Sequence, residues 1–220
     1  MLSAAKASRL LCRSQTAKKS PLRRSGSSYC TNTGFRPNIK VCGIGGGGGN
    51  AVNTLISRGI PGIEYVACNT DIQALAQSKA SSRVVLGKNL TKGLGTGSDT
   101  SQGLKAVEES AEALLAALNG ASMVFLAASL GGGTGTGAAP FIGRLLRSKG
   151  ILTVAVVTYP FRREGAVRRR IAKLGLKDLR SSVDAIIVVP NDSISKAAPP
   201  EASYAEALAF GDDVLFQAVR

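Results

Sequence analysis

The segment that most constrains the fold is Gly-Gly-Gly-Thr-Gly-Thr-Gly at residues 131–137. It follows an apolar run, residues 123–128, with the length of a buried strand. It precedes residues 138–149, where apolar side chains recur at helical spacing. At such a turn the unpaired N–H groups and the positive end of the helix dipole attract anions, and glycine lets the backbone approach phosphate oxygens. We therefore predict a phosphate-binding loop rather than a flexible connector.

Two further glycine-rich segments lie in similar surroundings. Residues 45–49 are all glycine and separate a predicted strand at 39–44 from a predicted helix at 51–58. Residues 93–99 form a third glycine-rich loop, before a predicted helix at 101–118. Several phosphate-friendly turns in one chain indicate a ligand that carries more than one phosphate.

Strands and helices alternate along the rest of the chain. Further strands are predicted at 63–68, 83–86, 151–157 and 183–189, and further helices at 163–179 and 201–220. This alternation predicts an α/β fold, a Rossmann-like parallel sheet with helices on both faces. Ligands of such sheets bind beyond the carboxyl ends of the strands. We expect the following segments to meet there: 45–50, 69–71, 131–137, 158–161 and 190–192.

Residues 1–38 differ sharply in composition from the rest. They contain eight Lys and Arg residues and no Asp or Glu, so they hold eight of the charges behind the net +14 and leave +6 for the remainder. An acid-free, basic start with Leu10 and Leu11 beside Lys6, Arg9 and Arg13 is typical of a transit peptide. We predict a mitochondrial leader in preference to a plastid one, with a disordered basic tail as the alternative.

Several functional classes are disfavoured by composition. The chain has no His, which removes Ser-His-Asp and Cys-His catalysis and leaves oxygen ligands, suited to Mg²⁺, as the metal chemistry. Its four Cys residues form no C-x-x-C pair, so neither zinc nor a disulfide framework is indicated. It has no Trp and few other aromatic residues, so we expect no nucleic-acid partner. No apolar run reaches membrane-spanning length, so we expect no direct membrane insertion.

The glycines alone leave the ligand open. Gly43, Gly45 and Gly48 satisfy the dinucleotide pattern G-x-G-x-x-G, so an NAD-dependent Rossmann oxidoreductase remains an alternative. The further glycine-rich segments disfavour it, because such an enzyme uses one such turn. The Walker pattern G-x-x-x-x-G-K-[ST] is absent. The pattern therefore favours a nucleoside triphosphate or a dinucleotide and does not choose the base.

Taken together, these segments resemble the FtsZ members of the tubulin/FtsZ family. The resemblance rests on GIGGGGGNAVN, NTD, GLGTGS, GGGTGTG, the EG…R stretch and PND, in that order, and runs from about Ile39 to Arg220. It implies a GTPase with GTP and Mg²⁺ as ligands that polymerises head to tail into filaments and serves cell or organelle division. It also implies binding roles for Gly46, Gly47, Asn50, Asn69, Thr70, Asp71, Thr96, Gly97, Ser98, Gly131, Gly132, Gly133, Thr134, Gly135, Thr158, Glu164, Arg168, Asn191 and Asp212.

Within this set, the resemblance places phosphate contacts at the glycine loops and guanine contacts at Asn191 and Asp212. It gives Glu164 and Arg168 ribose and phosphate contacts, whereas helical spacing alone favours a surface ion pair. Leu208 stands where the family usually stacks Phe on guanine, which weakens the expected stacking.

The resemblance also sets expectations for the domains. Residues 39–200 would form the GTP-binding domain and 201–220 the start of a long central helix, with the family's second domain and its water-positioning acidic loop absent. We therefore expect GTP binding with slow turnover unless full-length FtsZ supplies that loop. The alternative is a non-catalytic fragment that caps filaments.

Overall fold

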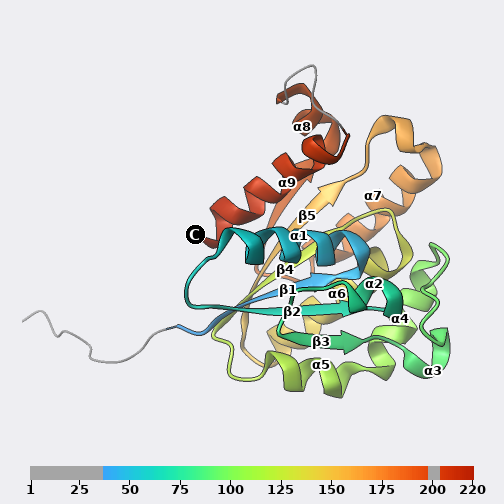
Figure 1. Ribbon diagram of the computed structural model, residues 1–220. Helices are drawn as coiled ribbons and strands as arrows, with labels where there is room; N and C mark the ends of the chain where they lie inside the picture. Colours follow the sequence, from blue (N-terminus) through green and yellow to red (C-terminus); the bar gives the residue numbers. More distant parts are fainter. Residues whose placement is uncertain (1–36, 198–203) are drawn as a thin grey trace, which may run out of the picture. The chain divides into compact units, whose positions relative to one another are not determined.

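Six parallel strands form the framework of the domain in a computed structural model that describes residues 37–197 and 204–220, with side chains for 37–194 and 212–220. The strand order is β3-β2-β1-β4-β5-β6, and every pairing is parallel. The strands are β1 (Ile39–Ile44), β2 (Ile63–Asn69), β3 (Ser82–Val85), β4 (Met123–Ser129), β5 (Leu152–Tyr159) and β6 (Ala185–Pro190). Figure 1 shows the sheet between two layers of helices.

The two faces of the sheet bury separate apolar clusters, because successive side chains on a strand point to opposite sides. On β1, Val41 packs in one cluster and Cys42 in the other, and both side chains are fully buried. One layer contains α1 (Gly45–Arg58), α2 (Ile72–Ala76), α8 (Asn191–Ala197) and α9 (Tyr204–Val219). The other contains α4 (Thr100–Glu109), α5 (Ala111–Leu118), α6 (Gly133–Ser148) and α7 (Ala166–Arg180). The α/β prediction is therefore confirmed.

The glycine-rich segments are more helical than predicted. The run at 45–49 forms the first turns of α1 and is not a loop before it. Likewise, α6 begins at Gly133, inside the Gly-Thr-rich segment. Glycine at position 48 lets the backbone of α1 pack closely against the backbone of β4. A Cβ atom there would collide with the carbonyl oxygen of Ala127. The connections from β1 to α1 and from β4 to α6 are therefore short: α1 follows β1 directly, and residues 130–132 join β4 to α6.

Two predicted helices are broken in the structure. The helix predicted at 101–118 divides at Ser110 into α4 and α5. The Ser110 hydroxyl accepts a hydrogen bond from Gly87 N–H at 2.9 Å and donates one to the Val85 carbonyl at 3.2 Å, which ties the break to β3. The helix predicted at 163–179 divides into a 3-10 turn, η1 (Arg162–Glu164), and α7, because Gly165 has a φ of +98°.

At the carboxyl end, Asn191 begins α8 directly after β6, a helix that the sequence analysis did not predict. The last helix, α9, begins at Tyr204, near the predicted 201. Residues 1–36 and 198–203, and the side chain of Leu208, lie outside the described parts, so the leader and stacking predictions stay predictions. In the described parts, no helix is both long and apolar enough to cross a membrane.

Candidate functional site

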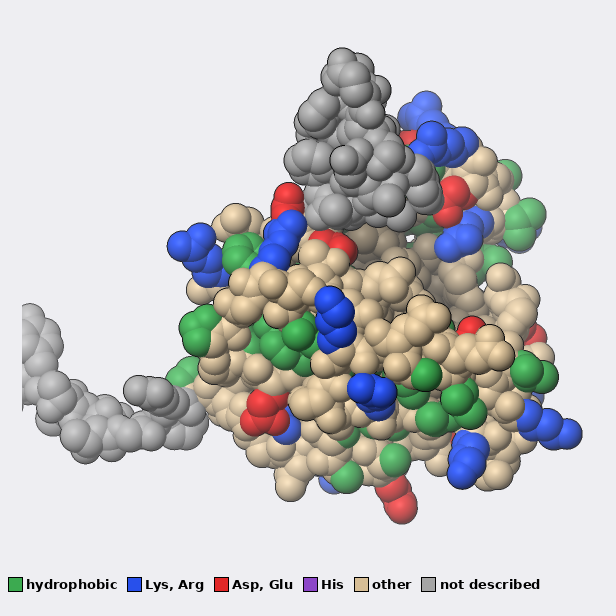
Figure 2. Space-filling model, in the orientation of Figure 1, with side chains coloured by type: hydrophobic (Ala, Val, Ile, Leu, Met, Phe, Trp, Pro, Cys, Tyr) green, Lys and Arg blue, Asp and Glu red, His purple; other side chains and the backbone are tan. Residues whose placement is uncertain are grey.

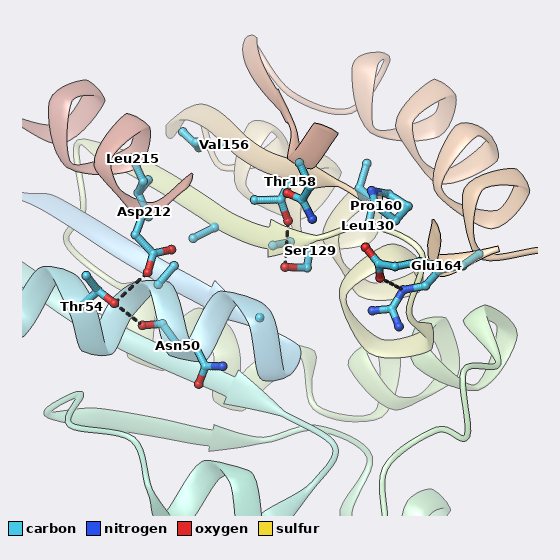
Figure 3. A pocket seen from close by; sticks show the side chains of 16 residues that line it. Asn50, Thr54, Ser129, Leu130, Val156, Thr158, Pro160, Glu164, Asp212 and Leu215 are labelled. Atoms are coloured by element: carbon cyan, nitrogen blue, oxygen red, sulfur yellow. Dashed lines mark hydrogen bonds and ion pairs between the residues drawn. The ribbon is translucent and has the colours of Figure 1, made fainter. Parts of the chain in front are cut away.

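A cavity of about 420 Å³ lies beyond the carboxyl ends of β4 and β5 (Figure 3). Of the segments predicted to meet there, 45–50, 158–161 and 190–192 contribute lining residues, whereas 69–71 and 131–137 do not. Of the residues that the resemblance assigns, those that line it are Gly47, Asn50, Thr158, Glu164, Arg168, Asn191 and Asp212.

Two of the lining side chains, Asn191 and Asp212, carry oxygen acceptors suited to a polar ring edge. Asn191 is 6 % exposed, and its Oδ1 atom is buried without a hydrogen-bond partner among the described residues. Asp212, on α9, accepts a hydrogen bond at 2.7 Å from the Thr54 hydroxyl on α1 (Figure 3). Burial raises the pKa of Asp212, and the Thr54 hydrogen bond opposes that rise. An unpaired buried oxygen is costly, so the cavity suits a ligand that donates hydrogen bonds to Asn191.

The floor of the cavity is polar where β4 and β5 end. Thr158 Oγ1 donates to Ser129 Oγ at 2.9 Å. Ser129 lies under α1, because a Cβ atom on Gly47 would collide with its side chain. The space above Gly46 and Gly132 is open, with no atom within 4 Å of the position of a Cβ. Both glycine turns therefore leave backbone accessible beside the cavity.

Three loops meet at the hydroxyl group of Thr134, in the first turn of α6. It lies 2.7 Å from the hydroxyl of Thr70 and 3.3 Å from that of Thr96. These contacts tie the segment at 69–71 and the third glycine loop to the Gly-Thr-rich turn. The Gly131 N–H donates to the Thr136 hydroxyl at 2.8 Å, so this amide is already used inside the protein.

Glu164 and Arg168 form an ion pair of 3.1 Å between Oε2 and Nε at the cavity wall. Glu164 Oε1 also accepts the backbone N–H of Phe161 at 2.7 Å. Since Gly165 separates η1 from α7, the two are not neighbours on one helix, and the helical basis for a surface pair was wrong. Glu164 and Arg168 thus form an ion pair with each other and also line the cavity.

The remaining predicted residues do not line the main cavity. They are Gly46, Asn69, Thr70, Asp71, Thr96, Gly97, Ser98, Gly131, Gly132, Gly133, Thr134 and Gly135. A second cavity of about 250 Å³ contacts Gly46, Asn50 and Asn69. Asn50 therefore lies between the two cavities. Asp71 caps α2, since its Oδ1 atom accepts the N–H groups of Gln73 and Ala74 at 2.9 and 3.1 Å.

Sequence reasoning missed Thr54 and Ser129. Thr54 follows Asn50 by four residues on α1, so the two lie on the same side of that helix, and this spacing could have revealed it. Ser129 is the last residue of β4, and nothing in its local sequence distinguishes it from a strand residue.

The described residues contain no cluster of three or more Cys, Asp or Glu side chains that could hold a metal ion by themselves. On the face shown in Figure 2, Lys and Arg side chains are scattered among other side chains over several elements.

The glycine turns beside a polar cavity in a parallel sheet define a nucleotide-binding α/β domain. The profile described as the Tubulin/FtsZ family, GTPase domain, matches residues 38–199, and the chain therefore belongs to this family.

Within the family, the chain is similar to FtsZ. It is 48 % identical over 187 residues to the cell division protein FtsZ of Rhizobium radiobacter, covering 85 % of this chain and 32 % of that protein. The identity to FtsZ 2 of Rhizobium meliloti is also 48 %, with 85 % and 54 % covered. The chain thus spans about a third to a half of the length of these relatives.

Solved structures agree with the sequence relatives. The chain matches an empty FtsZ dimer of M. jannaschii with a TM-score of 0.79 and 42 % identity, covering 84 % of this chain and 54 % of that one. It matches CetZ2 of Haloferax volcanii, a protofilament with GTPγS bound, with a TM-score of 0.75 and 26 % identity, covering 83 % and 57 %.

Proposed function

We propose that this chain binds GTP in the cavity beyond β4 and β5, with the base at Asn191 and Asp212 and the phosphates at the glycine turns. The observation that carries the proposal is that two acceptor groups line this cavity, the unpaired Asn191 Oδ1 and the Asp212 carboxylate. A carboxylate accepts the N1–H and 2-amino hydrogens of guanine, which are donors at one edge of the ring.

The phosphates would lie against backbone N–H groups at the starts of α1 and α6, where the helix dipoles favour negative charge. Thr134, held by Thr70 and Thr96, fixes the turn beside them. Arg168, kept at the cavity wall by Glu164, offers a cation to the phosphate or ribose oxygens.

Mg²⁺ fits this set of donors as an ion shared between the phosphates and protein oxygens. The Asp71 Oδ1 atom accepts the two N–H groups of the α2 cap, so Oδ2 is the carboxylate oxygen with which Asp71 would help to hold Mg²⁺. When bound, Mg²⁺ neutralises charge on the phosphates during transfer to water.

We also propose that the chain hydrolyses GTP and assembles head to tail, as an FtsZ-like division protein. The similarity to a protein solved as an FtsZ dimer and to another solved as a protofilament supports this assembly. Slow turnover of the chain by itself remains our prediction.

The test uses the 220-residue chain with Mg²⁺. GTP, ATP and NADH are titrated, and phosphate release is followed as the protein concentration rises, with and without a full-length FtsZ. GTP-selective binding supports the proposal, and rescue of turnover by the full-length protein supports head-to-tail contact. Selective NADH binding or no GTP binding would refute it. Shorter filaments of the full-length protein would instead support the capping alternative.

We further propose that residues 1–38 direct the chain to mitochondria. The acid-free, basic composition of this segment supports the proposal. Residues 1–38 fused to a fluorescent protein should label mitochondria. Labelling of plastids, or diffuse fluorescence, would overturn it.

A further inference from the structure

Three residues on one side of α1, spaced four apart, connect the phosphate end of the site to α9. Asn50 lines the cavity, and Thr54 donates to Asp212 Oδ2 at 2.7 Å. Arg58 forms an ion pair with Asp213, the next residue on α9. The position of the Asp212 carboxylate is thus set from α1.

The Thr54 hydroxyl has one proton and two acceptors within reach. One is Asp212 Oδ2 at 2.7 Å, and the other is the Asn50 carbonyl oxygen at 3.1 Å, one turn earlier on α1. An ionised carboxylate takes the proton more strongly than a carbonyl does. If Asp212 is protonated, its own O–H can donate to Thr54, and the Thr54 proton can turn to Asn50. The hydroxyl therefore has one arrangement for each protonation state of Asp212.

We propose that Thr54 is a positioning residue for base recognition, whose hydrogen bond to one oxygen of the Asp212 carboxylate keeps the second oxygen toward the cavity. Figure 3 shows that second oxygen on the cavity side and the dashed bond to Thr54 on the other. The inference rests on the proposed GTP site, and it adds a residue that contacts the carboxylate and not the base.

The groups around Asp212 act in opposite directions. Burial raises the pKa of Asp212 most, the Thr54 hydrogen bond and the charge of Arg58 lower it, and the charge of Asp213 raises it. Asn191, which lines the same cavity, is neutral. Of the two groups that favour ionisation, Thr54 alone also fixes the orientation of the carboxylate through a hydrogen bond.

The protonation state of Asp212 decides which base edge it matches. An ionised carboxylate accepts both guanine donors, N1–H and the 2-amino group. A protonated acid offers one donor and one acceptor, which match the N1 acceptor and the 6-amino donor of adenine. We therefore expect the preference for GTP over ATP to fall as the pH falls, and Thr54 to set where this occurs.

The experiment measures dissociation constants of GTP and ATP for the full chain between pH 5 and pH 8, with Mg²⁺ present. The ratio of the two constants removes the titration of the γ-phosphate, which both nucleotides share. Thr54→Val keeps the branched shape without the hydroxyl, and Thr54→Ser keeps the hydroxyl. Thr54→Ala is the second hydroxyl-free variant in case Val disturbs folding.

For Thr54→Val we expect roughly tenfold weaker GTP binding at neutral pH, the effect of losing one hydrogen bond to a charged group. As the pH is lowered, the preference of Thr54→Val for GTP over ATP should be lost at a higher pH than in the wild type. Thr54→Ser should lose this preference at the same pH as the wild type. If the Val and Ala variants gave the wild-type selectivity profile, or if Ser behaved like Val, the role of Thr54 would be overturned. A wild-type chain with no preference for GTP at any pH would instead overturn the proposed function.

Discussion

At the scale of single residues, Asp212 is placed so that folding and binding favour different protonation states. Because burial raises the pKa of Asp212 in the folded protein, at pH values between the unfolded and folded pKa the folded state binds more protons at this residue than the unfolded state does. The stability that this adds is fully present below the unfolded pKa and is lost as the pH rises through the folded pKa. Binding a guanine edge requires the form that folding disfavours.

A neutral amide at this position should remove that pH dependence. We predict that the unfolding temperature of Asp212→Asn, relative to the wild type without nucleotide, rises between pH 4 and pH 7. Scanning fluorimetry across this range measures it, with Asp213→Asn as the neighbouring control. Differences that stay constant with pH for Asp212→Asn would contradict the assignment.

Asn191 gives a second residue-scale prediction. Its buried, unpaired Oδ1 atom costs the ligand-free protein about 1–3 kcal/mol. In Asn191→Ala we expect GTP affinity to fall about tenfold, through the lost hydrogen bond, without a loss of ligand-free stability. Binding titrations and thermal unfolding of the same preparation separate the two effects. Equal losses of affinity and stability would indicate a structural role only.

At the scale of elements, the glycine-rich start of α1 mixes glycines that are required with others that are not. A Cβ atom at Gly48 would collide with the backbone of β4, whereas the same atom at Gly49 has no neighbour within 4 Å. We predict that Gly48→Ala destabilises the domain by about 1–3 kcal/mol through overpacking. Gly49→Ala should stabilise it by up to about 1 kcal/mol through helix propensity.

Chemical denaturation of the two variants without nucleotide tests this pair, and each is the control for the other. Similar changes in both would show that the close contact between α1 and β4 does not limit this helix.

The order of helices and strands could largely be predicted from the sequence, whereas their breaks could not. The alternation of strands and helices and the glycine turns after β1 and β4 were predictable, because glycine runs between apolar segments mark where a strand gives way to a helix. The break at Ser110 was not, because its hydroxyl bonds Gly87 and Val85, which are distant in sequence. The spacing from Asn50 could have placed Thr54 at the site, but its hydrogen bond to Asp212 could not be predicted, because Asp212 lies 158 residues away. Local sequence patterns predict helices, strands and turns, but they do not predict hydrogen bonds between side chains that are distant in the sequence.

At the scale of the whole molecule, the chain separates into residues 1–35 and a unit from Arg36 to Arg220 that contains every element of the site. We predict that removing residues 1–36 leaves both the unfolding temperature and the GTP affinity unchanged. Parallel thermal scans and titrations of the shortened and complete chains provide the measurement. A loss of either property would mean that the basic segment contributes to the folded domain.

The path of α1 has a consequence for which molecules the domain can distinguish. Its fourteen residues extend about 21 Å, from the phosphate turn at Gly45 past the carboxylate that Thr54 holds. In the proposed complex, α1 therefore lies beside both the phosphate end and the base end of the ligand. Affinity would then depend on the length of the ligand as well as on its chemical groups. Inorganic phosphate, or a nucleoside without phosphates, would contact only one end of α1 and would therefore bind more weakly than the whole nucleotide.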